Sequence, residues 1–146
     1  MVEDLTGRDD VELLLWRFYG KALSDPVLAE PFAELRVKGL RSHIPVMSDF
    51  WETVLFRAGL YHGSALTVHR QLHARHPLSA PHFVRWLTLW TETVDELFQG
   101  PHAERAKLQA GRIAKAMHRR LAGVRRRRTR CSCVLTLLGV SGPLDL

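Results

Sequence analysis

The sequence predicts an all-α protein with a single folded domain. Large apolar residues recur at the three- to four-residue spacing of amphipathic helices in several segments, and no segment shows the sustained alternation of a β-strand. Gly and Pro separate these segments. With 146 residues, 46% of them hydrophobic and 25% charged, the chain has the size and composition of a globular domain with its own core.

The first helix is expected to start at Asp9 and Asp10, because carboxylates are favourable at a helix N-terminus. The sequence Ser24-Asp25-Pro26 should end it, since proline disfavours helical backbone in the preceding residue. A turn from Val27 to Phe32 then leads through Gly39 to the next helix. The apolar face of the first helix comprises Val11, Leu14, Leu15, Phe18 and Ala22, with Tyr19 beside them.

The central helix is expected to start at or just before His43, which places Pro45 in the first turn, where proline costs no hydrogen bond. The pattern breaks after Arg57, at Gly59 and Gly63, and a short segment follows that carries His69. Such an arrangement could hold His43 and His69 on opposite sides of a flat apolar space. A flat apolar ligand with a central metal would suit that space. The residues that share the helix face with His43 are Met47, Phe50, Trp51 and Val54.

Two longer helices complete the predicted domain. Pro77 to Pro81 precede the first of them, and Gly100-Pro101 ends it and starts the second. The apolar stripe of the first comprises Phe83, Trp86, Leu87, Trp90, Val94 and Leu97, and that of the second comprises Ala106, Ala110, Ile113, Ala114, Met117 and Leu121.

The last part of the chain, residues 122–146, differs in composition from residues 1–121, the predicted folded domain. The net charge of +6 depends on seven arginines between Arg119 and Arg130. An eight-residue apolar patch follows, which is too short to span a membrane. We expect a poorly ordered basic and apolar tail. Cys131 and Cys133 are too close for a fold-stapling disulfide, and no apolar signal core stands at the N-terminus, so a cytoplasmic protein is expected.

Taken together, the motifs resemble the group III truncated haemoglobins over roughly residues 8 to 121. Each motif alone is common, and it is the full series in this order that carries the resemblance. One position departs from the pattern, because Ala65 stands where the family usually has proline. The glycine pairs of the other truncated haemoglobin groups are missing, as they are in group III. The matching motifs are Phe18-Tyr19, Asp25-Pro26, Phe32, His43-Ile44-Pro45-x-Met47-x-Asp49-Phe50-Trp51, Tyr61-x-Gly63, His69-x-x-Leu72, Phe83-x-x-Trp86-Leu87 and Ala110-x-x-Ile113-Ala114.

The resemblance implies a two-over-two helical sandwich around one haem b, in a bacterial protein. It implies that His69 is the metal ligand, with its second ring nitrogen oriented by a carbonyl or water. The alternative is a surface histidine, because His62, His73 and His76 are near in sequence. A small metal site with His73 is disfavoured, since no carboxylate or cysteine completes it.

On the distal side the resemblance implies three hydrogen-bond donors to a bound ligand: Tyr19, His43 and Trp86. The alternative for Tyr19 and Trp86 is plain core packing, which is the expected role of Trp16, Trp90 and part of Trp51. For His43 the alternatives are an exposed helix start or a gate that swings outward. Arg41, Arg70 and Arg75 either reach the haem propionates or are simply solvated. The predicted apolar wall of the haem pocket comprises Phe32, Met47, Phe50, Leu72, Phe83, Leu87 and Met117.

These features predict a haem protein that binds dioxygen, nitric oxide or related nitrogen species. The alternative is a haem enzyme with peroxidase-like or nitric-oxide dioxygenase activity. Any turnover requires an external electron-donating reductase, because the chain has no flavin or nicotinamide motif. A more remote alternative treats the arginine run as the nucleic-acid arm of a helical module, although a basic tail is usually just solvated and no specific nucleic acid is expected.

Overall fold

The structure, a computed structural model, describes residues 2–57, 59, 65–75 and 77–122, and these residues form helices and no strand. The predictions about Tyr61, Gly63 and the tail lie outside the described residues. Within the described ranges, none of the helices is long and apolar enough to cross a membrane. The helices are α1 (Arg8–Ala22), α2 (Ala33–Lys38), α3 (His43–Phe56), α4 (Ala65–Arg75), α5 (Ala80–Leu97) and α6 (Pro101–Ala122).

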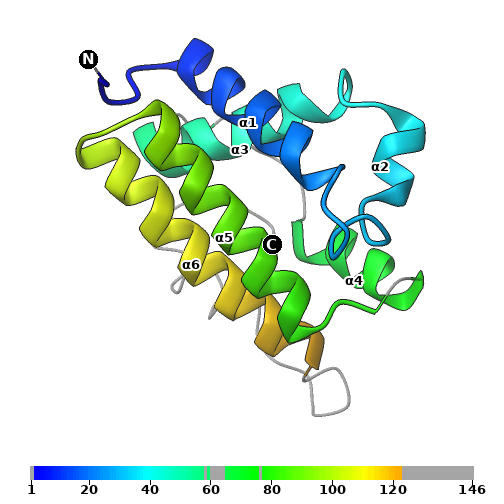
Figure 1. Cartoon of the computed structure of the whole chain (residues 1–146). Coiled ribbons are helices and arrows are strands. Elements are labelled where there is room, and N and C mark those ends of the chain that lie inside the picture. Colours follow the sequence, from blue (N-terminus) through cyan, green and yellow to red (C-terminus); the bar gives the residue numbers. More distant parts are fainter. Residues whose placement is uncertain (1, 58, 60–64, 76, 123–146) are drawn as a thin grey trace.

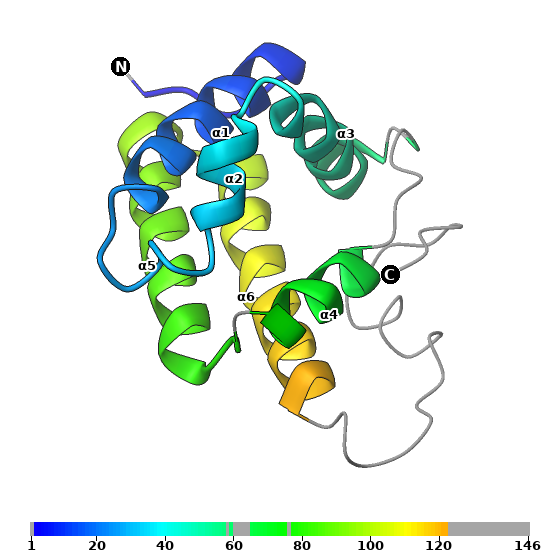
Figure 2. The ribbon, with the colours of Figure 1, turned by 90° about the vertical axis from the view of Figure 1, so that its right-hand side faces the viewer.

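Four of the helices form two crossed layers (Figure 1). Helices α1 and α3 pack against each other in one layer, and α5 and α6 pack against each other in the second. The layers meet where α1 contacts α5 and where α3 contacts α6. Helix α4 packs on α6 and lies on the same side of the two layers as α2 (Figure 2). This confirms the prediction of an all-α, two-over-two sandwich.

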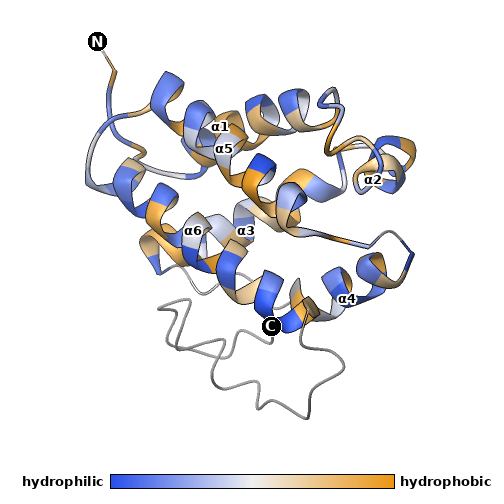
Figure 3. Cartoon of the chain, turned by 60° about the horizontal axis from the view of Figure 1, so that its bottom comes forward, coloured by the Kyte–Doolittle hydropathy of each residue, from blue (hydrophilic) through white to orange (hydrophobic). Residues whose placement is uncertain are grey.

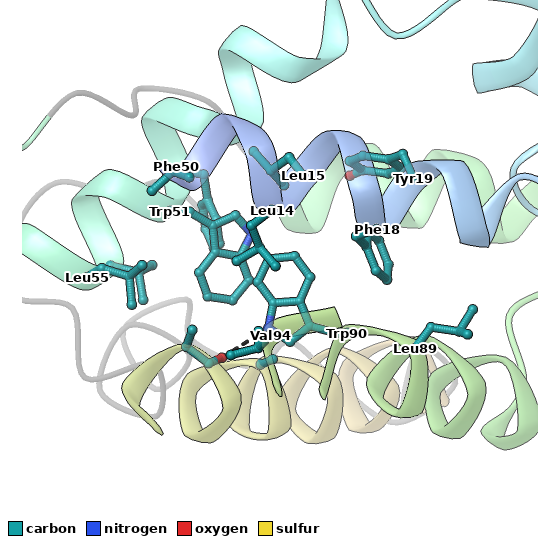
Figure 4. Close-up of a cluster of buried hydrophobic side chains, with 14 of the residues drawn as sticks. Leu14, Leu15, Phe18, Tyr19, Phe50, Trp51, Leu55, Leu89, Trp90 and Val94 are labelled. Carbon is teal, nitrogen blue, oxygen red and sulfur yellow. Dashed lines mark hydrogen bonds between the residues drawn. The ribbon is translucent and has the colours of Figure 1, made fainter. Parts of the chain in front are cut away.

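The core lies between the two layers and is built around tryptophans (Figure 4). Trp51 of α3 stacks on Trp90 of α5 with ring centroids 4.4 Å apart. The indole N–H of Trp90 donates to the Ala106 carbonyl oxygen of α6 at 3.2 Å, so this buried polar atom is satisfied. Phe18 of α1 meets Trp90 edge to face at 5.2 Å. The expectation that Trp51 and Trp90 are packing residues is therefore confirmed.

In the first third of the chain, one expectation is wrong and one helix was not predicted. Trp16 is 46% exposed and not a core residue. At about 100° per residue it lies far around α1 from Val11, Phe18 and the rest of the buried face. The expected turn from Val27 to Phe32 is present, but the segment between this turn and Gly39, for which no helix was expected, forms the short helix α2. No side chain of α2 is buried, so no apolar periodicity could reveal it.

The start of α3 is as predicted. The helix begins at His43, with Pro45 in its first turn, and ends before Arg57, which has left-handed backbone (φ 56°). Arg8 of α1 ties α3 in place, since its Nη1 atom lies 2.6 Å from Asp49 Oδ1 and its Nη2 atom donates to the Pro45 carbonyl oxygen. These contacts fix the position of the start of α3, and with it His43, relative to α1.

The two long helices are amphipathic, with polar and apolar residues on different sides of their turns (Figure 3). The capping histidine of α5 is His82, whose Nδ1 atom accepts the Ser79 backbone N–H at 3.0 Å. The start of α6 is capped from the far end of the chain. The carboxylate of Asp4 accepts the backbone N–H groups of His102 and Ala103 at 2.9 and 2.8 Å. Asp4 thus satisfies two donors that the first turn of a helix leaves open.

Candidate haem site

The distal side of the site is organised by a contact between Tyr19 and His43. The Tyr19 hydroxyl of α1 and the Nε2 atom of His43 of α3 are hydrogen bonded at 2.8 Å. The two rings meet edge to face with centroids 5.0 Å apart. Tyr19 is only 5% exposed, and burial raises its pKa well above the ordinary 10.0, so the phenol keeps its proton at neutral pH. Two of the three predicted distal donors therefore touch each other.

His69 occupies the centre of the inward side of α4. Leu66, one turn earlier, is buried, while His69, Leu72 and His73 are partly buried. The other side chains described between Thr67 and Arg75 are exposed. Spacings of three to four residues place the inward group on one helix face. The sequence prediction that His69 is presented from a short segment after the central helix agrees with this placement.

The two histidines are close enough to influence each other. Burial, and then the charge of His69, lowers the pKa of His43 below its ordinary 6.5. An interaction between two like charges falls off with distance, so His69 of α4 lies near enough to His43 of α3 for its charge to act there. The sequence prediction that the two histidines lie on opposite sides of one flat apolar space stays a prediction.

His73 has a different role from that of a metal ligand beside His69. Its Nδ1 atom accepts the backbone N–H of Leu78 at 2.9 Å and so closes the turn between α4 and α5. Within the part of the chain that the structure describes, no three His, Cys, Asp or Glu side chains are arranged to hold a metal ion by themselves.

Trp86 lies on the opposite layer from Tyr19, and Phe18 stands between them. Its ring stacks on Trp90 with centroids 6.0 Å apart and meets Phe18 edge to face, also at 6.0 Å. Phe18 in turn meets Tyr19 at 5.1 Å. Trp86 is partly buried, whereas Trp90 is 1% exposed. The structure thus brings Trp86 near the Tyr19 helix without placing it in the closed core.

The predicted apolar wall divides into two groups. Phe50 and Met117 are buried at 4% and 7% exposure, and Phe50 packs at a right angle on Trp51. The other members remain partly exposed although they are large and apolar. Phe32 meets the Tyr19 ring at 6.1 Å, and Phe83 lies against His118 at 5.3 Å. The partly exposed members are Phe32, Met47, Leu72, Phe83 and Leu87.

These observations fit the haem that the sequence resemblance implied. Haem is a flat, mostly apolar macrocycle that needs an axial imidazole and an apolar lining. His69 supplies an imidazole on the partly buried face of α4, and the partly exposed apolar side chains leave surface that a bound macrocycle would cover. The donor set and the lining are thus both of the required chemistry.

Sequence reasoning missed the ion pairs that hold these elements together. Asp25, 5% exposed, lies 2.6 Å from Arg85 Nε and also accepts the backbone N–H groups of Val27 and Leu28. Burial alone would raise the pKa of Asp25, but these hydrogen bonds outweigh burial and lower it. The pair joins the turn after α1 to α5 one residue before Trp86. In the sequence, Asp25-Pro26 indicates a helix end and is one of the matching motifs, but neither observation identifies Arg85 as the partner of Asp25.

Among the three arginines considered for the haem propionates, Arg75 is engaged elsewhere. Its guanidinium forms a two-pronged ion pair with Glu34 of α2. Arg41 and Arg70 are exposed. The sequence could not distinguish the three, because the partner of Arg75 lies 41 residues away.

Helices α1 and α3 crossed over α5 and α6, with α4 carrying a histidine at their edge, make the two-over-two fold of the truncated globins. A solved structure with this fold is that of the group III truncated hemoglobin from Campylobacter jejuni, with a TM-score of 0.74. The match covers 83% of this chain and 95% of that one, at 22% sequence identity. The chain matches no protein-family model and no curated protein. The likeness establishes the fold that the sequence predicted.

Proposed function

We propose that this chain is a haem protein of the group III truncated haemoglobin type, which binds haem b through His69. The observation that carries the proposal is that His69 lies on the partly buried face of α4, near enough to His43 of α3 for its charge to lower the pKa of His43. The truncated-globin fold supports the proposal, as do the large apolar side chains of the predicted wall that remain partly exposed. When bound, haem iron supplies an open position for a diatomic ligand, namely dioxygen or nitric oxide.

The distal residues would then bind and orient that ligand. Dioxygen takes up partial negative charge on binding, so a nearby O–H or N–H donor slows its release. When the proton of His43 sits on Nε2, that nitrogen donates to the Tyr19 oxygen, and the hydroxyl proton of Tyr19 is free to point at the ligand. In the other tautomer Tyr19 donates to His43. The tautomer of His43 thus controls whether Tyr19 can donate to the ligand.

Trp86 would add a third donor from the opposite layer. Its indole ring is fixed on two sides by Trp90 and Phe18, which limits how far the N–H can turn. A fixed donor costs little reorganisation when the ligand arrives. Carbon monoxide carries little charge and would gain much less from any of these donors.

The same donors favour a second function, an enzyme that acts on nitric oxide or peroxide. Tyr19 and His43 are hydrogen bonded at 2.8 Å, and such a pair can polarise an O–O bond and deliver a proton to it. Turnover of that kind needs electrons from a separate reductase. Rapid consumption of nitric oxide with a supplied reductase would distinguish the enzyme from a binding protein. A cytoplasmic location in a bacterium is part of the same proposal.

Titration of the purified protein with haem tests the proposal. The expected result is a Soret band that saturates at one haem per chain, and a shifted band after reduction and addition of carbon monoxide. A titration with no saturation, or with the spectrum of free haem, would contradict it. His73→Ala is a control variant for this titration, because it removes a histidine from the same helix as His69 and keeps the proposed ligand. It should still bind one haem per chain.

A further inference from the structure

Few of the side chains described on α4, residues 66–75, are buried, although the helix carries His69. The helix packs on α6, and among these described side chains that of Leu66 is buried. Helix α2, on the other side of the site, contributes no buried side chain at all. Elements with few buried apolar contacts open locally at low cost. The position of α4 therefore depends strongly on the remaining ties between it and its surroundings.

One such tie is a two-pronged ion pair between α4 and α2. The Nε atom of Arg75 lies 2.5 Å from Glu34 Oε1, and its Nη2 atom lies 2.8 Å from Glu34 Oε2. Both oxygens of the carboxylate are matched by two nitrogens of the planar guanidinium, which is the geometrically favoured form of such a pair. The hydrogen bond to Glu34 also raises the pKa of Arg75.

The pair connects the two sides of the proposed haem site. Arg75 ends the helix that presents His69, and Glu34 lies two residues after Phe32, whose ring meets Tyr19 at 6.1 Å. Tyr19 is hydrogen bonded to His43. A continuous path of contacts thus runs from the end of α4 through α2 to the distal hydrogen bond. Movement of α4 away from α2 would have to break the ion pair first.

We propose that the Glu34–Arg75 pair is a latch that positions α4, and with it His69, and thereby sets how fast haem leaves. This inference rests on the proposed haem-binding function. The side chains of Arg75 and Glu34 are 51% and 34% exposed, so salt screens the latch. Retention of haem should accordingly weaken as ionic strength rises, which distinguishes the latch from apolar packing.

Transfer of haem to an excess of apomyoglobin measures the latch directly. Glu34→Gln and Arg75→Gln should each speed haem loss about two- to fivefold at low salt, the range of exposed pairs with good geometry. The double variant should lose haem no faster than either single variant, since both remove the same interaction. The charge swap Glu34→Arg with Arg75→Glu should restore much of the retention. Arg17→Gln, which removes an exposed arginine of α1 outside the proposed site, is the charge control and should behave as wild type.

Two readouts separate positioning of His69 from general stability. Raising the salt concentration should speed haem loss from the wild type and leave the double variant nearly unchanged. The iron–histidine stretching band of the reduced protein should shift or broaden in both single variants and not in Arg17→Gln. Wild-type rates and an unchanged band in the single variants would overturn the proposal, as would additive effects in the double variant.

Hydrogen exchange of the haem-free full chain provides a test that does not depend on haem. Amides of residues 65–75 should exchange faster in Glu34→Gln than in wild type, with no change in α5. Faster exchange together with unchanged haem loss would show that the pair holds α4 but does not control retention, which overturns the proposal. A wild type that takes up no haem would refute the proposed function, while unchanged exchange would refute the latch independently.

Discussion

Replacing Tyr19 by Phe deletes one oxygen from the distal side and leaves the ring in place. The ring is held by edge contacts with Phe18 at 5.1 Å and Phe32 at 6.1 Å, and these contacts do not involve the hydroxyl. In the ligand-free protein, the variant loses the 2.8 Å hydrogen bond with His43. In the ligand-bound protein, it loses the proposed hydrogen bond from the Tyr19 hydroxyl to dioxygen. A net hydrogen bond contributes about 0.5–1.5 kcal/mol, and more when the acceptor carries charge.

That range sets the size of the expected kinetic effect. Because about 1.4 kcal/mol is a factor of ten, Tyr19→Phe should speed dioxygen release roughly 3- to 30-fold. In Tyr19→Phe, the Nε2 atom of His43 no longer has the Tyr19 hydroxyl as a partner. If His43 then turns and donates to the ligand, the acceleration should lie toward the lower end of this range. The ligand-free variant should also lose about 1 kcal/mol of unfolding free energy with the same hydrogen bond.

Stopped-flow displacement of dioxygen by carbon monoxide measures the release rate. Trp86→Phe is the companion variant, because it too deletes a donor and keeps an aromatic ring, and a similar acceleration is expected. Carbon monoxide release should change far less in both variants. Wild-type dioxygen release in both would show that Tyr19 and Trp86 only pack, and the distal assignment would then rest on His43 alone.

Three further outcomes are expected. Haem-loaded protein should melt about 10 °C above haem-free protein, because ligand at about a hundredfold over its Kd stabilises the fold by about 2.7 kcal/mol; coincident melting curves would contradict a haem-filled site. The haem-free fold should lose stability as pH falls below about 6.5, because the pKa of His43 is lowered in the fold and the unfolded chain therefore binds more protons at that pH. Urea titrations measure the free energy of unfolding at each pH. The same loss in His43→Gln would exclude His43 as the cause. A chain truncated after Leu121 should keep its haem spectrum and dioxygen kinetics and lose any salt-sensitive binding to nucleic acid or anionic lipid, whereas marked loss of haem would show that the tail supports the site.

The parts of the fold that the sequence predicted are those indicated by the regular spacing of nearby residues. The start of α3 at His43 followed from the tolerance of a first-turn proline, and the buried face of α1 followed from helical spacing. The same spacing, applied to Trp16, would have placed it on the outer face of α1. Its size and aromatic character suggested core packing instead, and the structure shows that position on the helix decided the outcome.

The parts that the sequence could not predict depend on contacts between distant residues. Asp4 caps a helix that starts 97 residues later, Asp25 pairs with a residue 60 positions away, and Glu34 pairs with Arg75 across 41 positions. The position of a single charged residue in the sequence does not indicate which distant residue it will pair with. At the site, the sequence placed His43 and His69 on separate elements, but only the folded chain brings Tyr19 to within 2.8 Å of His43.

The central claim is that His69 alone fixes the haem iron to the protein. The direct measurement is the absorption and resonance Raman spectrum of His69→Gly purified from haem-supplied cells, before and after addition of imidazole. The variant should contain little haem, and free imidazole should restore both binding and a histidine-like five-coordinate spectrum by filling the place of the missing side chain. Normal haem content with the wild-type iron–histidine band in the absence of imidazole would contradict the claim.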